Sequence, residues 1–166
     1  MKKIVICMVI LATLFALSCK SGPTSSGAVI EGEVTQGKIN DALSLIYNSY
    51  RGKLDLTGAQ DYTVQRGDSL SEITRRFYGN LTGVGNAGSS NGFYFPVIMA
   101  ASGSHIVDPD FIEPGMKLTI PDLKRNLANS TSKKAIKSCL EDVAYVYSRK
   151  GQSQTEEGLK NLSKSI

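Results

Sequence analysis

Apolar residues recur at helical spacing in two segments, one on each side of the centre of the chain. In residues 38–53 they fall at i, i+3, i+4, i+7, i+8 and i+11, which is one face of a helix. In residues 132–150 the same pattern is stronger, and Gly151 suits the end of that helix. A weaker helical pattern follows, so we expect a C-terminal helical segment over residues 132–166. Helices of this length are not stable alone, and we expect them to pack on one another or on the centre of the chain.

The first half of the central region has short patterns with clear turn signals. Residues 62–65 alternate between apolar and polar side chains, which predicts a strand. The stretch SLSE at residues 69–72 is a capping box, in which a serine and a glutamate satisfy early N–H groups of a helix. We expect this helix to turn Leu70, Ile73 and Phe77 inward.

The second half of the central region predicts another helix and another strand. Residues 80–92 are rich in glycine and have no clear period, which predicts a mobile loop. Residues 93–101 have helix-compatible spacing, and Gly103 can end that helix. The Pro–Gly pair in residues 113–116 predicts a type II turn, because glycine accepts the positive φ at its third position. Residues 118–120 then alternate as a second strand.

Taken in order, these central elements resemble a LysM domain over residues 61–122. The resemblance rests on YTVQRGDSL at 62–70, Ile73, FYGN at 77–80, PDFIEPG at 109–115 and LTIP at 118–121. It implies an α+β fold in which amphipathic helices flank a βααβ module. It also implies binding of the N-acetylglucosamine glycans of peptidoglycan or chitin.

In LysM domains the sugar lies in a shallow groove between two loops. The matching residues here are Gly67, Asp68, Ser69 and Leu70 for one wall and Pro109, Asp110, Phe111 and Ile112 for the other. Backbone groups of such loops can pair with the amide and hydroxyls of the sugar, while apolar side chains can cover its methyl group. Each residue also has a structural interpretation: Ser69 as a helix cap, for example, Gly67 as a turn residue, and Phe111 or Ile112 as core.

Two features depart from the usual family pattern. Residues 80–92 lengthen the link between the helices, as in a subclass of bacterial LysM proteins that includes a potassium-binding one, so ion sensing is a third hypothesis. Ala101–Ser102 stands where the family usually has Ala–Asn, which removes an amide near the second wall. An alternative function is therefore an envelope scaffold whose LysM module no longer binds glycan and whose flanking helices recruit a protein partner.

The N-terminus resembles a bacterial lipoprotein signal. Lys2 and Lys3 precede an apolar run that ends at Leu17, which is short for a membrane span but suits a signal peptide over residues 1–18. Ala16 to Cys19 resembles a lipobox, which implies lipidation of Cys19. We expect residues 19–37, rich in Gly, Ser, Thr and Pro, to form a flexible tether. The alternatives are an ordinary signal peptide cut near residue 18 and an uncleaved anchor.

Composition and charge exclude several classes of function. The net charge of +4, with scattered basic residues, argues against nucleic-acid binding. Of three cysteines only Cys139 would remain free in the mature chain, and its place on an apolar stripe predicts a buried thiol. His105, the only histidine, lies in a polar stretch, so we expect it to be solvated and not part of a metal or catalytic site.

The sequence thus predicts a non-enzymatic envelope lipoprotein that binds peptidoglycan and needs no cofactor and no metal. We expect its lipid to lie in a membrane and its LysM module to bind peptidoglycan or a related N-acetylglucosamine glycan. Lys20 follows Cys19 where an inner-membrane retention signal would place Asp, which favours the outer membrane, facing the periplasm.

Overall fold

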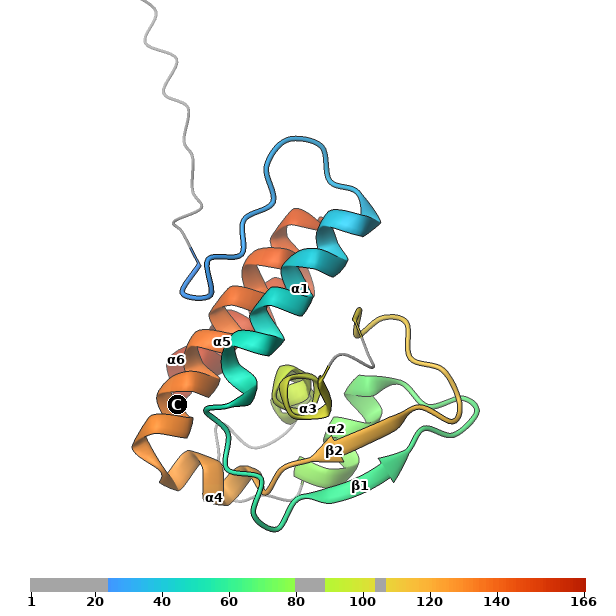
Figure 1. Cartoon of the computed structure of the whole chain (residues 1–166), viewed down its shortest axis with the longest axis vertical. Coiled ribbons are helices and arrows are strands. Elements are labelled where there is room, and N and C mark those ends of the chain that lie inside the picture. Colours follow the sequence, from blue (N-terminus) through green and yellow to red (C-terminus); the bar gives the residue numbers. More distant parts are fainter. Residues whose placement is uncertain (1–23, 80–88, 104–106) are drawn as a thin grey trace, which may run out of the picture.

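The computed structural model of the chain describes residues 24–79, 89–103 and 107–166 (Figure 1). The predicted signal peptide, Cys19, most of the 80–92 loop and His105 lie outside the described residues. The elements, in chain order, are α1 Gln36–Arg51, β1 Gln60–Thr63, α2 Leu70–Tyr78, the 3-10 helix η1 Ser89–Tyr94, α3 Phe95–Ser102, β2 Lys117–Ile120, α4 Leu123–Ala128, α5 Ser130–Arg149 and α6 Ser153–Ser165. The predicted α+β fold, a βααβ unit flanked by helices, is confirmed.

The two strands form an antiparallel sheet. Tyr62 pairs with Leu118, and β1 begins two residues earlier than the alternation predicts. Main-chain pairing continues past β1, because the N–H of Val64 donates to the carbonyl of Met116 at 2.9 Å. The predicted type II turn is present: Met116 N–H donates to the carbonyl of Glu113 at 3.1 Å, and Gly115 has φ of 92°.

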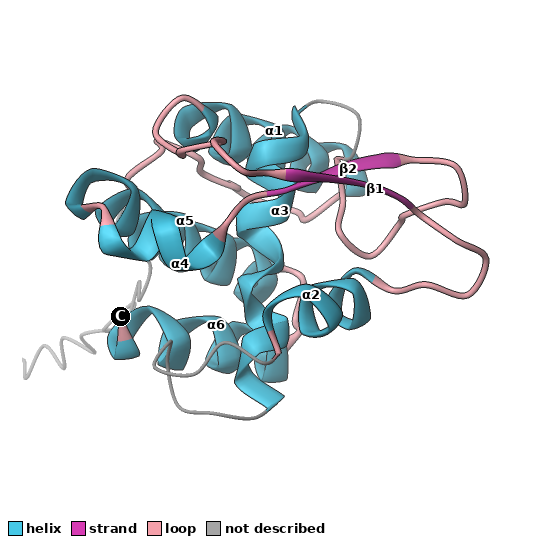
Figure 2. Cartoon of the chain, turned by 90° about the horizontal axis from the view of Figure 1, so that it is seen from below, coloured by secondary structure: helices cyan, strands magenta, loops and turns pink. Residues whose placement is uncertain are grey.

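The two helices of the βααβ unit differ in exposure. Helix α2 buries one face, with Leu70 and Ile73 inward as predicted, but its buried aromatic residue is Tyr78, and Phe77 is only partly buried. In α3 all eight residues are buried, which is typical of a helix surrounded by protein. Figure 2 shows α3 in the middle, with α1 above it, α5 on the left, and the sheet and α2 on the right, and α3 packs on all of them. The C-terminal end of α3 is fastened to β2 because Ser102 Oγ accepts a hydrogen bond from Thr119 N–H at 3.0 Å.

The flanking helices use their apolar stripes in the core. α1 packs on α3 and α5, and α5 also packs on α6, so both packing modes left open by the sequence occur. The stripe residues that are buried include Leu43, Ile46, Val143 and Tyr147. Cys139 is buried among them as predicted, and this burial raises the pKa of its thiol. The short helix α4 was not predicted.

The segment before α1 is folded, which corrects the expectation of a flexible tether up to residue 37. The N–H groups of Ser25 and Ser26 donate to the buried carboxylate of Asp142 at 2.9 and 2.8 Å. Ala28 and Ile30 are buried in the core. This part of the chain folds because it supplies hydrogen-bond donors to a buried carboxylate and apolar surface to the helices.

Candidate functional site

A cavity of about 460 Å³ lies between the turn that leads into α2 and the loop that leads into β2. It brings together the predicted wall residues except Gly67 and Phe111. Its lining residues are Asp68, Ser69, Leu70, Ser71, Arg75, Gly92, Phe93, Phe95, Pro109, Asp110, Ile112, Tyr147 and Thr155. We call residues 67–71 the first wall and residues 108–112 the second wall.

The first wall is built around the carboxylate of Asp68, whose side chain is 8% exposed. Its oxygens accept hydrogen bonds from the hydroxyl of Tyr62 at 2.5 Å and the N–H of Gln65 at 2.8 Å. Arg76 pairs with the same carboxylate at 3.2 Å. These hydrogen bonds, led by that of Tyr62, and the charge of Arg76 lower the pKa of Asp68 below its usual value. The carboxylate therefore holds the turn in shape.

Ser69 and Gly67 complete the first wall, Ser69 as a helix cap and Gly67 as a turn residue. Ser69 Oγ caps α2 by accepting from Glu72 N–H at 3.4 Å, and it donates to the Glu72 carboxylate at 2.9 Å. Gly67 has φ of 89°, a conformation that glycine adopts without steric cost, and it shapes the turn from outside the cavity.

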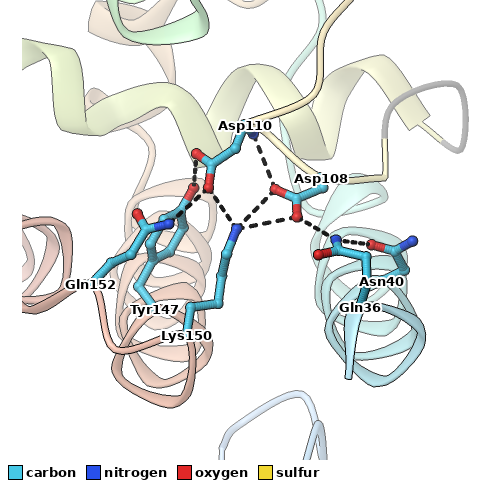
Figure 3. Close-up of polar contacts among 7 residues, drawn as sticks. All are labelled: Gln36, Asn40, Asp108, Asp110, Tyr147, Lys150 and Gln152. Atoms are coloured by element: carbon cyan, nitrogen blue, oxygen red, sulfur yellow. Dashed lines mark hydrogen bonds and ion pairs between the residues drawn. The ribbon is translucent and has the colours of Figure 1, made fainter. Parts of the chain in front are cut away.

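The second wall is fastened by the buried carboxylate of Asp108 (Figure 3). Lys150 Nζ lies 3.1 Å from both of its oxygens, and the side chains of Lys150 and Asp108 are only 8% and 3% exposed. Gln36, at the start of α1, also donates to Asp108 at 2.7 Å. Within the wall, the carbonyl of Asp108 accepts from Phe111 N–H at 3.0 Å, which forms a turn at residues 108–111.

Asp110 joins the second wall to the C-terminal helices (Figure 3). Its carboxylate accepts hydrogen bonds from Tyr147 at 3.0 Å, Lys150 at 2.6 Å and Gln152 at 3.1 Å. Partial burial raises the pKa of Asp110, but the hydrogen bond and charge of Lys150, with the hydrogen bonds of Gln152 and Tyr147, outweigh it, so the pKa lies below its usual value. Asp110 is thus an ionised contact between the loop and the helices.

Of the last two residues of the second wall, Ile112 lines the cavity and Phe111 does not. Ile112 is half-buried, packs against the core and lines the cavity. Phe111 is 65% exposed and is not one of the lining residues. Neither residue is fully buried in the core.

The remaining side of the cavity is formed by residues that the sequence did not indicate. Phe93 and Phe95 come from η1 and α3, whereas Tyr147 and Thr155 come from α5 and α6. The rings of Phe95 and Tyr147 meet edge to face, with centroids 5.8 Å apart. Only the packing of the C-terminal helices brings Tyr147 and Thr155 to the cavity, so no local pattern could have revealed those two residues.

The lining combines apolar surface with polar groups that can orient a ligand, as ligand sites do. Leu70, Phe93, Phe95 and Ile112 supply apolar surface, while Ser71 and Thr155 carry hydroxyl groups. Among the described residues, no group of three or more His, Cys, Asp and Glu side chains could hold a metal ion. The carboxylates of Asp108 and Asp110 already share Lys150.

Comparison with known families identifies the central unit. Residues 62–121 match the model of the LysM domain, so a LysM domain is present there. Domains of this family bind N-acetylglucosamine glycans. No curated protein and no solved structure matches the chain. Within residues 24–79, 89–103 and 107–166, no helix has both the length and the apolar content to cross a membrane.

Proposed function

We propose that the LysM domain of this chain binds peptidoglycan, or a related N-acetylglucosamine glycan, in the cavity between its two walls. The observation that carries this proposal is that one cavity unites Ser69 and Leu70 of the first wall with Pro109 and Ile112 of the second. These walls come from segments about forty residues apart in the sequence. The chain acts as a binding protein and not as an enzyme.

The chemistry of the lining suits an N-acetyl sugar. Leu70 and Ile112 face the cavity from opposite walls and can cover the acetyl methyl group or a face of the sugar ring. The hydroxyls of Ser71 and Thr155 can exchange hydrogen bonds with those of the sugar. A single small cavity binds weakly because desolvation of sugar hydroxyls offsets much of the gain. Many anchored copies on a polymeric wall would bind more tightly through avidity.

We further propose that Cys19 carries the lipid that holds the protein in the cell envelope, in the outer membrane and facing the periplasm. Five residue steps separate Cys19 from Thr24, where the described fold begins, and they reach at most about 18 Å. The folded part would therefore lie close to the membrane. Residues 24–27 lie on the outer side of α1 and α5, with α3 and the sheet on the other side (Figure 1). An anchored molecule would thus present its cavity away from the attachment point.

The scaffold alternative has less support. It relied on the apolar stripes of residues 38–53 and 132–150, and these stripes are buried in the core. It also relied on the replacement at Ser102, whose hydroxyl bonds to β2 and keeps the end of α3 in place.

Co-sedimentation with purified peptidoglycan sacculi tests the proposal. The soluble chain from Lys20 to Ile166 should pellet with sacculi, and N-acetylglucosamine oligomers should release it. Ile112→Ala should weaken binding about tenfold, which corresponds to the loss of about 1.4 kcal/mol of apolar contact. Phe111→Ala is the matched control and should pellet like the unchanged chain. A folded chain that stays in the supernatant would exclude peptidoglycan as its ligand.

A further inference from the structure

Arg75 is a positively charged residue at the cavity that no carboxylate of the chain neutralises. It lies in α2, its side chain is exposed, and it lines the cavity. None of the ion pairs among the described residues includes it. The segments outside the described part, residues 1–23, 80–88 and 104–106, contain no Asp or Glu. Every side-chain carboxylate of the protein is therefore described, and none pairs with Arg75.

The neighbouring charges are already paired. Arg76, the next residue, bonds to Asp68 and to the hydroxyl of Tyr62. On the opposite wall Lys150 pairs with both Asp108 and Asp110. Arg76 and Lys150 are therefore already engaged in ion pairs, whereas Arg75, which lines the cavity, has no carboxylate partner.

The position of the Arg75 side chain is set by its packing on Gly92. A Cβ atom at position 92 would lie 3.4 Å from Arg75 Cγ and 3.7 Å from Cδ, so the methylene stem of Arg75 lies directly over the backbone of this glycine. Arginine stems commonly pack in this way while the guanidinium stays in water. The packing holds the guanidinium at the cavity without fixing it in an ion pair.

We propose that Arg75 binds a carboxylate of the ligand, and that the cavity prefers a glycan in which an acidic group lies beside the N-acetyl sugar. A guanidinium pairs with a carboxylate through two parallel N–H···O bonds, a geometry that a sugar hydroxyl cannot match. This inference rests on the proposed function and adds a substrate class to it. Chitin-type oligomers carry no carboxylate. Peptidoglycan offers two sources, the lactyl group of its muramic acid and the stem peptide attached to that group.

Calorimetric titration with matched ligands separates these cases. The first ligand is the peptidoglycan disaccharide with a free lactyl carboxylate, and the second is the same disaccharide with that carboxylate as its methyl ester. The third carries a stem peptide, in which the lactyl carboxyl is an amide and only peptide carboxylates remain. The fourth is a neutral N-acetylglucosamine disaccharide.

The unchanged chain should bind at least one carboxylate-bearing ligand roughly tenfold more tightly than the ester and the neutral disaccharide, and salt should reduce this difference. Arg75→Gln should abolish the preference, so that its affinities for the acidic and the neutral ligands lie within about twofold of each other. Lys124→Gln, which removes an exposed charge in α4 away from the cavity, is the control and should keep the preference. Whether the first or the third ligand is preferred identifies the source of the carboxylate.

Equal affinity of the unchanged chain for acidic and neutral ligands would overturn the inference while leaving the proposed function intact. The same holds if Arg75→Gln weakens all four ligands equally, because that result indicates packing and not charge recognition. If no ligand binds, the proposed function fails, and this inference fails with it.

Discussion

The two walls of the cavity differ in which part of the chain supplies the hydrogen bonds and ion pairs that hold them in place. The first wall is held from within the LysM domain, since Tyr62, Gln65 and Arg76 all bond to Asp68. The second wall is held from outside it. Lys150 and Gln36, which bond to Asp108, lie beyond the residues that match the family.

This difference shows that the LysM domain is not an independent module in this protein. Helix α3 is buried on all sides because α1 and α5 cover the faces that the sheet leaves open. The same helices hold the second wall and complete the cavity with Tyr147. The flanking helices therefore act as part of the candidate binding site.

Removing Lys150 should have the largest effect on this arrangement. Lys150→Met leaves the carboxylate of Asp108 buried without its cation, and breaking a buried pair in this way costs about 3–5 kcal/mol. We expect a loss of about 3 kcal/mol in the free energy of unfolding, because Gln36 still donates to Asp108, together with weaker glycan binding. Urea denaturation followed by circular dichroism measures the first effect.

Lys160→Met is the matched control. Lys160 pairs with Glu156 one turn away on α6, and its side chain is 51% exposed. Such pairs contribute little, so the free energy of unfolding should change by less than about 0.5 kcal/mol. Similar losses in the two variants would mean that the second wall does not depend on the buried pair.

Gly158→Ala should have the next largest effect, because it forces α6 away from the cavity lining. A Cβ atom at this position would overlap the ring of Phe93. Overpacking of this kind costs about 1–3 kcal/mol, and overlap with three atoms of the ring indicates the upper part of that range, above the gain in helix propensity of about 1 kcal/mol. Thermal unfolding should show a lower midpoint. Gly37→Ala in α1 is the control: its Cβ would meet only Thr35 Oγ1 at 4.0 Å, so that variant should keep or raise the midpoint.

Ser69→Ala should affect the first wall more mildly. It removes the hydroxyl that caps α2, which typically costs about 1 kcal/mol. The Asp68 contacts remain, so the turn should keep its shape and the chain should still bind glycan. Denaturation and titration of the same sample measure both. A loss as large as that of Lys150→Met would contradict the view that the first wall supports itself.

The smallest effect should come from acidification. The pKa of Asp110 in the folded protein lies below its unfolded value, so its contribution to stability is present above about pH 4 and is lost as the pH falls through the lowered pKa. Unfolding free energies between pH 6 and pH 2 should therefore fall less steeply for Asp110→Asn than for the unchanged chain. Asn161→Ala, an exposed change in α6 that removes no titratable group, should leave the slope unaltered.

Local sequence patterns predicted the parts of the fold whose interactions are local. The Ser69 cap, the turn at Gly115 and the stripe of α5 each depend on residues a few positions apart, and each is confirmed. The folded segment at Ser25 was missed because its partner, Asp142, is more than a hundred residues away.

The residues of the candidate site also fall into two groups, those that the sequence indicated and those that only the packing of distant segments reveals. The family resemblance indicated the wall residues, since they lie in two short continuous stretches. It could not indicate Tyr147 or Thr155, because these residues lie on helices outside the family match and reach the cavity only through helix packing. Nor could it show that Asp108, which does not line the cavity, is the buried group that fastens the second wall.

The most direct test is to map ligand contacts on the intact chain. Backbone amide resonances should be assigned and followed while an N-acetylglucosamine oligomer is added. The shifted resonances should gather at residues 68–71 and 109–112 and include residues near Tyr147 and Thr155 on the C-terminal helices. Shifts confined to residues 62–121, or gathered on a different face, would contradict the claim that the LysM domain and the flanking helices form one site.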